Sequence, residues 1–439
     1  MVALWLGLSA AHALTYEVVD LGVLPGDSTS VALAVQGDVV VGNSQTFLPN
    51  AYVYDGAMVD IGNLGGSSPS STGEAIGSAG AQVVGSTSSP AGLRAFSWTA
   101  AGGIENLGTL PGYAWSWAQG ISPDGGFIVG DLMGVSASDP FVGFVIEAGG
   151  SMTQLGDYHG VLSDSSVARD VNDAGHVVGW NGQWPDTWAW RLDTTDGTLV
   201  ELGHLGGGQS DAYAVNSSGA VAGTSTLADD TRKAFRWTEA AGQQLLPDFG
   251  GPSEGRGIDD AGNVVGESGP AGGGRPTASL WPASGGHVDL NDLIDPSDGW
   301  ILETAADISE SGIIVGKGLK GPSRAVMLVP LVATNGLGGL VPGAAGTTNE
   351  VSATATPGDT LWLVAGREPG IVPIPTVCPG VAVEVDAPRV IAGPVIVDGA
   401  GNAMFSVALP AALSGQSIWM QTVSTTTCEL SEAAVQALL

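Results

Sequence analysis

The sequence predicts an all-β fold built from repeated four-stranded units. An apolar pair followed by glycine occurs seven times, with successive glycines 43 to 50 residues apart. Two further patterns are also found seven times: a polar residue and an apolar one usually followed by Gly, and a closing strand that mostly begins with Ala and often ends in Trp. A four-stranded unit cannot bury both of its faces alone, and this period is that of propeller blades. We therefore predict a seven-bladed β-propeller followed by a small β-sandwich.

Residues 201–237 show one unit most clearly. A strand signal at 201–203 precedes a Gly-rich turn, a strand of alternating small residues from Ser210 to Ala214, a turn at 216–219, a short apolar strand and a strand that ends at Trp237. We interpret the small residues as the innermost strand, where neighbouring units approach closely. These four strands are expected to form one unit.

The two ends of the repeat region indicate that the ring closes. The last repeat stops near Leu331 without a polar–apolar–Gly strand of its own, whereas residues 16–22 form such a strand ahead of the first repeat. We expect the N-terminal strand to complete the seventh unit. An open solenoid is the alternative.

Residues 1–13 predict export. They are apolar and end in Ala-His-Ala, which fits a signal-peptide cleavage site, although a basic region is absent and the segment is short. A buried first strand is the alternative. Beyond residue 13 no run of 18 uncharged apolar residues occurs, so no membrane-spanning segment is predicted. We expect a secreted or cell-surface monomer with residues 14–331 as the propeller.

The net charge of the chain indicates which classes of partner it can bind. The chain has 13 Lys and Arg against 44 Asp and Glu, a formal net charge of −31. Such a surface repels phosphate backbones, so no nucleic acid is expected. The expected partners are an extracellular glycan or a surface protein. No cofactor is predicted; a cation such as calcium suits the charge, but no calcium-loop motif is present.

The composition changes after the repeats. Residues 332–349 are rich in Gly and Ala and are predicted to be a linker. Residues 350–439 contain short strand signals between Pro and Gly turns, which predict an Ig-like β-sandwich. Cys378 and Cys428, the two cysteines of the chain, both lie there, and with an export signal they predict one disulfide.

Five residues are candidate ligand contacts. Asp170 and Asp307 replace a small residue of the innermost strand, so their carboxylates would bind a cation or a substrate hydroxyl near the axis, or else cap the adjacent turns, the interpretation we favour. Trp180 and Trp184 lie near Asp186 where a loop lengthens; they would stack on a sugar ring, or pack in the core. No residue is predicted to ligate a metal.

No catalytic signature is present. The sequence lacks HExxH. Residues 251–255 (GPSEG) match GxSxG in letters only, because Ser253 belongs to a strand of small residues rather than to a strand-to-helix turn. The acidic residues cannot be paired by spacing alone. We expect a binding or interaction scaffold, with glycans as candidate ligands. The alternatives are a glycan-cleaving or lyase-type enzyme with its site at the propeller mouth, and a structural spacer.

The repeat resembles the HAF family of bacterial extracellular repeats. The matching segments are residues 60–66, 175–179, 210–216 and 234–237, while Arg94 or Lys233 stands where the family's tripeptide has His. The resemblance implies a secreted or surface-exposed, propeller-like protein and supplies no catalytic residues. The last segment resembles Ig-like modules of bacterial surface proteins.

Overall fold

The computed structural model divides the chain into two compact units, one of which spans Tyr16–Pro330. In that unit it describes residues 16–78, 80–136, 139–155, 165–183 and 186–330. In the second unit it describes residues 336–341, 348–354, 358–366, 369–373, 382–385, 389–397, 402–408, 417–424 and 434–437.

The described strands of the first unit form seven four-stranded antiparallel sheets. Six of them are consecutive in the chain: β2 (Thr29–Gln36), β3 (Val39–Gln45), β4 (Pro49–Tyr54) and β5 (Met58–Asp60); β6 (Ser71–Gly77), β7 (Gln82–Ser89), β8 (Gly92–Thr99) and β9 (Gly103–Gly108); β10 (Tyr113–Ile121), β11 (Phe127–Gly134), β12 (Phe141–Glu147) and β13 (Thr153–Gln154); β14 (Ser165–Val171), β15 (His176–Gln183), β16 (Asp186–Asp193) and β17 (Leu199–Gly203); β18 (Ser210–Val215), β19 (Val221–Thr226), β20 (Arg232–Thr238) and β21 (Gly242–Leu245); β22 (Gly250–Ile258), β23 (Val264–Pro270), β24 (Thr277–Trp281) and β25 (Val288–Asp289).

The seventh sheet joins the two ends of the unit. It contains β26 (Ile301–Ile308), β27 (Ile314–Leu319) and β28 (Ser323–Pro330), and its fourth strand is β1 (Tyr16–Gly22). β1 pairs antiparallel with β28, with Tyr16 opposite Pro330. The expected pairing of the N-terminal strand with the last repeat is therefore present.

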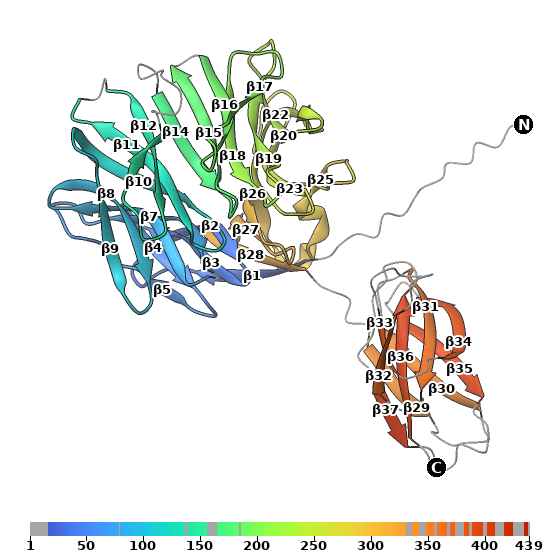
Figure 1. Ribbon diagram of the computed structural model, residues 1–439. Helices are drawn as coiled ribbons and strands as arrows, with labels where there is room; N and C mark the ends of the chain where they lie inside the picture. The colour runs from blue at the N-terminus through green and yellow to red at the C-terminus, as the bar shows by residue number, and fades with distance from the viewer. Residues whose placement is uncertain are drawn as a thin grey trace, which may run out of the picture. The chain divides into compact units, whose positions relative to one another are not determined.

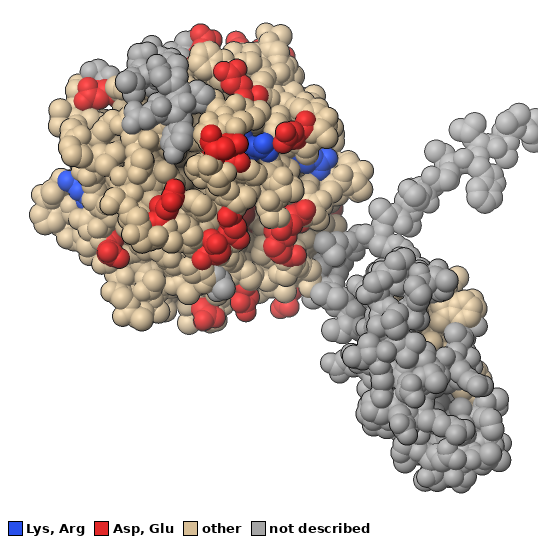
Figure 2. Space-filling view, viewed as in Figure 1, with Lys and Arg blue, Asp and Glu red and all other residues tan. Residues whose placement is uncertain are grey.

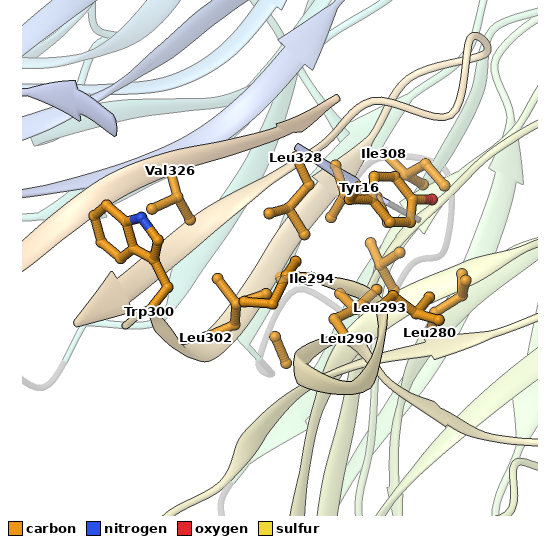
Figure 3. Close-up of a cluster of buried hydrophobic side chains, with 14 residues drawn as sticks. Tyr16, Leu280, Leu290, Leu293, Ile294, Trp300, Leu302, Ile308, Val326 and Leu328 are labelled. Atoms are coloured by element: carbon orange, nitrogen blue, oxygen red, sulfur yellow. The ribbon is translucent and has the colours of Figure 1, made fainter. Parts of the chain in front are cut away.

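A hydrophobic cluster reinforces this junction. Tyr16 packs in one buried cluster with Leu328 of β28 and with Leu290 and Leu293 of a short 3-10 helix, η2 (Leu290–Leu293), as Figure 3 shows. A second short 3-10 helix, η3 (Pro296–Asp298), follows. The buried tyrosine ring fastens β1 to the sheet that it completes.

The first strands of the seven sheets contact one another in succession. β2 contacts β6, β6 contacts β10, and the series continues through β14, β18, β22 and β26 back to β2. Figure 1 shows the sheets following one another around a common centre. The small residues are required there: a Cβ on Gly120 would come within 2.8 Å of Arg169 O, and one on Gly257 within 2.9 Å of the Asp307 Cα. The predicted crowding of the innermost strands is confirmed.

The serine that opens most of these strands links each sheet to the one before it. Its hydroxyl accepts a backbone N–H from the third strand of the preceding sheet at 2.8 to 3.2 Å. The donors and acceptors are Ala325 to Ser30, Ala51 to Ser71, Ala95 to Ser116, Gly143 to Ser166, Ala189 to Ser210 and Ala234 to Ser253. Serine thus fits this position both because it is small and because its hydroxyl oxygen accepts a hydrogen bond.

One expectation about the unit needs correction. The strand at 201–203 was expected to open the unit that ends at Trp237, but β17 pairs with β16 and closes the preceding sheet. The short turn after Asp193 makes a hairpin of β16 and β17, whereas the longer segment between Gly203 and Ser210 leads to the next sheet.

The second unit is also all-β. Its sheets are β29 (Gly336–Val341), β30 (Thr348–Thr354) and β35 (Asn402–Ala408); β34 (Arg389–Ile396), β31 (Thr360–Gly366), β36 (Ser417–Ser424) and β37 (Ala434–Ala437); and β32 (Pro369–Pro373) with β33 (Ala382–Val385). Burial alternates along β35, where Phe405 and Val407 are buried, and along β31 as far as Leu363, with Leu361 also buried. Each of these strands therefore presents one apolar face to a core.

The linker prediction was wrong for part of its range. Residues 332–349 include β29, which pairs antiparallel with β30, and β30 begins at Thr348, before the expected start of the sandwich at residue 350. The ladder uses backbone groups, so a Gly-rich stretch such as GLGGLV forms a strand when a partner strand is available. Cys378, Cys428 and residues 1–13 lie outside the described residues.

Candidate functional site

Each innermost strand contains a β-bulge at the same place. In all seven sheets the register between the first and second strand shifts within the first strand, between a small residue and the residue two positions later. That later residue is Ala or Gly in five sheets and Asp170 or Asp307 in the other two, and the residue between the two has no partner opposite. The bulged residues are Leu33, Glu74, Gln119, Arg169, Tyr213, Arg256 and Ala306. Bulges redirect side chains and are common beside functional sites.

The glycine of the repeat faces each bulge. A Cβ on Gly85 would collide with the carbonyl oxygen of Thr72, and a Cβ on Gly223 would collide with that of Asp211. The same collision with the first strand occurs at the other glycines of the pattern, Gly42, Gly130, Gly179, Gly266 and Gly316. The first strand therefore approaches the second so closely at the bulge that only glycine fits opposite it.

All seven bulged residues line one cavity, the central cavity. It has a volume of ≈ 500 Å³ and is lined by the first strands of all seven sheets and by the turns that follow some of them, such as Asn172 and Ser309. This volume lies within the usual range for small-ligand sites, roughly 300–1,000 Å³. The lining combines donors, acceptors and apolar side chains.

Asp170 and Asp307 line the central cavity and hold neighbouring strands. The Asp170 carboxylate accepts N–H groups from Val171 at 2.8 Å and from Val215 of β18 at 2.9 Å. Asp307 accepts in the same way from Ile308 at 2.8 Å and from Val35 of β2 at 2.9 Å. Burial raises the pKa of Asp170 to about 7 and that of Asp307 to about 6, and these N–H bonds oppose the shift.

The turn-capping interpretation of Asp170 was wrong. The adjacent turn is capped by Asn172, whose side-chain oxygen accepts N–H groups from Ala174 and His176. Asp170 instead satisfies an N–H on the edge of β18, because the innermost strand of a sheet has no further strand beside it.

Around the bulged arginines the charges are paired. Arg169 contacts Asp211 at 3.5 Å, and Arg256 contacts Glu254 at 2.8 Å and Glu267 at 3.5 Å. Burial raises the pKa of Asp211 to about 6, opposed by Arg169. Positive and negative groups are thus interspersed rather than separated into patches.

Two further acids lie near this network. Asp131 is buried and accepts N–H groups from Ala168 and Gln119, each at 3.1 Å. Burial raises its pKa to about 7, opposed by Arg169. Burial also raises the pKa of Glu74. These carboxyls are therefore less readily ionised than exposed ones, which reduces the negative charge around the cavity near neutral pH.

A second, smaller cavity, the side cavity, has a volume of ≈ 280 Å³. It is lined by Arg169, Trp180, Thr187, Gln209, Ser210, Asp211, Tyr213, Thr224, Ser225, Thr226 and Arg232. Arg169 and Tyr213 line both cavities. The side cavity lies where the β14–β15 and β18–β19 strand pairs meet.

The candidate ligand contacts predicted from the sequence do not lie together in one site. Asp170 and Asp307 both line the central cavity, whereas Trp180, which is half-buried, lines the side cavity. Asp186 is exposed at the start of β16 and lines neither cavity. Trp184 lies outside the described residues.

The bulged residues were missed by the sequence interpretation. Their signal was present in most repeats as a large or polar residue between two small ones, as in Ala212-Tyr213-Ala214. Regular alternation assigns that residue to the opposite face of the strand, and a register shift at that point is not visible in the alternation itself.

The surface charge and the arrangement of possible metal ligands do not indicate a further site among the described residues. Figure 2 shows Asp and Glu side chains spread over the visible face of the first unit, with fewer Lys and Arg. Among the described residues, no group of three or more His, Cys, Asp or Glu is placed to hold a metal ion. The same residues include no helix long and apolar enough to cross a membrane.

No protein-family model matches the chain, and no curated protein matches it. Solved structures share some similarity. TolB from Acinetobacter baumannii matches at 12% identity and TM-score 0.41, over 60% of this chain and 63% of that one. An oligogalacturonate lyase in complex with manganese matches at 10% identity and TM-score 0.45, over 72% and 96%. An oligogalacturonate lyase from Vibrio parahaemolyticus matches at 9% identity and TM-score 0.47, over 72% and 97%. At such identity these similarities transfer no function to this chain.

Proposed function

We propose that Tyr16–Pro330 is a closed seven-bladed β-propeller that binds a neutral polyhydroxylated ligand, such as a glycan, in its central cavity. The observation that carries the proposal is the ring of bulges, which brings a side chain from each of the seven sheets to one cavity. A spacer needs neither the bulges nor the variety of side chains at them. Consecutive contacts between the first strands and the β1–β28 pair support closure.

The chemistry of the lining favours a neutral ligand. Arg169 and Arg256 are each paired with acids, and Gln119 and Tyr213 add uncharged polar groups. Interspersed donors and acceptors suit hydroxyl groups, which donate and accept at once. A cation would lie beside two guanidinium groups, and an anion beside the acids of the lining, which include Glu74, Asp173 and Glu310.

The enzymatic alternative is less well supported. Asp170 and Asp307 are the acids that the sequence offered for it, but both oxygens of each carboxylate already accept a backbone N–H. These bonds hold the innermost strands, so we assign the two acids to the ring rather than to proton transfer. Binding without turnover is the function that this geometry supports best.

The remaining features of the proposal concern context. We propose that residues 1–13 direct export to the cell exterior or surface, that residues 350–439 form most of an Ig-like sandwich, and that Cys378 and Cys428 are joined. We also propose that the repeats are of the HAF type. In support, the S-x-A, G-x-V-V-G, A-F-x-W and D-L-G segments coincide with the four successive strands of a sheet.

The test is a binding titration of the full chain with neutral oligosaccharides, namely maltose, cellobiose, lactose and xylobiose, followed by ligand-observed NMR. In Ala306→Phe the new ring would occupy the central cavity, and we expect at least a tenfold loss of affinity for any sugar that binds. Ala241→Phe, on an exposed turn, is the matched control and should bind as the wild type does. Unchanged binding by Ala306→Phe would place the ligand elsewhere, and no binding by the wild type would favour a spacer or protein partner.

A further inference from the structure

The side cavity carries three buried polar atoms with unmet hydrogen-bonding capacity. Arg169 Nε, Asp211 Oδ1 and Thr224 Oγ1 each have no hydrogen-bond partner among the described residues, and all three side chains line this cavity. Thr224 is 3% exposed, so bulk water does not serve its hydroxyl. Buried polar groups in folded proteins are nearly always paired, so three exceptions around one cavity indicate a missing partner.

The three atoms have complementary roles. The Arg169 Nε–H donates, Asp211 Oδ1 accepts, and the Thr224 hydroxyl does both. Adjacent hydroxyl groups on one ligand match such a set, because each hydroxyl also donates and accepts. Trp180 lines the same cavity and supplies an apolar ring. An aromatic ring beside convergent polar groups suits a sugar ring, which has an apolar face and polar edges.

Charge and size restrict the ligand further. Asp211 neutralises Arg169 at 3.5 Å, and Glu254 neutralises Arg232 at 3.0 Å, so no uncompensated charge remains to attract an ion. A volume of ≈ 280 Å³ lies near the lower end of the range for small-ligand pockets. The cavity therefore suits one compact ring rather than a chain of several.

We infer that the side cavity is a subsite for a single neutral polyhydroxylated ring, such as one sugar residue, held by Arg169, Asp211 and Thr224 against Trp180. This inference builds on the proposed function, to which it adds a second contact point and the size of the group that binds there. It can fail separately, because Ala306 lines only the central cavity and Thr224 lines only the side cavity.

The experiment uses the full chain and ligand-observed NMR with glucose, galactose, mannose and myo-inositol as probes. Thr224→Val keeps the shape of the side chain and removes its hydroxyl, so we expect a roughly tenfold loss of affinity for the probe that binds. Thr224→Ser restores the hydroxyl and should restore binding. Thr277→Val is the matched control, because Thr277 Oγ1 is also buried without a partner among the described residues but lies outside both cavities.

Stability gives a second readout. An unpaired buried hydroxyl disfavours the folded state, so Thr224→Val should unfold at the same temperature as the wild type without ligand, or at a higher one. A variant that is as stable as the wild type yet does not bind supports a ligand role. A loss of both stability and binding that Thr224→Ser does not restore would indicate a structural role and overturn the inference.

The remaining outcomes are also decisive. Binding that Thr224→Val leaves intact and Ala306→Phe abolishes would confine the ligand to the central cavity, which overturns the inference and retains the proposed function. Binding of glucuronate or glucosamine but of no neutral probe would overturn the neutral class. Absence of binding by any probe, in the wild type and in Thr277→Val alike, would overturn the inference.

Discussion

Asp170 and Asp307 show how one residue can serve both the ring and the cavity. Each carboxylate satisfies an N–H on the edge of a neighbouring innermost strand, β18 for Asp170 and β2 for Asp307. The Asp307 bond links the last sheet to the first. Burial beside the cavity makes these carboxyls harder to ionise than exposed ones. The stability of the contacts between the innermost strands should therefore depend on pH.

The pH dependence has a definite sign. The folded pKa values, about 7 for Asp170 and about 6 for Asp307, exceed the ordinary value of 3.8, so the folded chain retains protons that the unfolded chain has released. The contribution of these two groups to the free energy of unfolding is therefore fully present below about pH 4. It is lost as the pH rises towards 7, by at most about 1.4 kcal/mol per pH unit for each carboxyl.

The Asp170→Asn and Asp307→Asn double variant should reduce this dependence, since the amide does not ionise and its oxygen still accepts one of the two N–H groups that each carboxylate accepts. Urea unfolding between about pH 4 and 7 measures it. Asp186→Asn, at an exposed strand start, is the control and should follow the wild type. A double variant whose free energy of unfolding declines as steeply as that of the wild type would contradict the assignment.

At this scale the sequence predicted part of the site. Asp170 and Asp307 were found because they break a pattern of small residues, and both line the central cavity. Arg169 and Tyr213 were not found, because alternation places them on the wrong face and only the bulge turns them to the cavity. Thr224 gives no signal in the sequence; its unpaired hydroxyl is defined by neighbours from other strands.

At the scale of elements, the bulge and the glycine opposite it form a structural unit that recurs in all seven sheets. Gly85 faces the carbonyl of Thr72 so closely that any Cβ would collide with backbone, which cannot yield as a flexible side chain does. The strands themselves were predictable from their patterns. The pairing of β17 with β16 could not be predicted in the same way. The sequence gives the order of the strands, but it does not show whether a Gly-rich segment lies within one sheet or connects two sheets.

Gly85→Ala should therefore destabilise the first unit by about 1–3 kcal/mol through overpacking at the bulge, measured by urea unfolding. Gly269→Ala is the control, because its nearest neighbour would lie at 3.4 Å, an ordinary contact. Equal stability of Gly85→Ala and wild type would mean that the strands separate readily there, and the glycine would then have no structural role in the bulge.

At the scale of the whole molecule, closure gives the central cavity its walls. β1 covers the edge of β28, and Tyr16 is buried with Leu328, so the sheet that joins the two ends of the unit has four strands like the others. Counting strand signals predicted this pairing, because the last repeat lacked one strand and the N-terminus offered it. The cavities themselves arise from seven strands distant in sequence, which periodicity alone does not place.

Hydrogen–deuterium exchange of the full chain, with and without a sugar that binds, tests the central claim most directly. A ligand in the central cavity should slow exchange together in innermost strands that are far apart in sequence, including residues 33–37, 119–121, 213–217 and 306–311, all of which contribute to its lining. Protection confined to one outer hairpin or to residues 350–439 would contradict a central site.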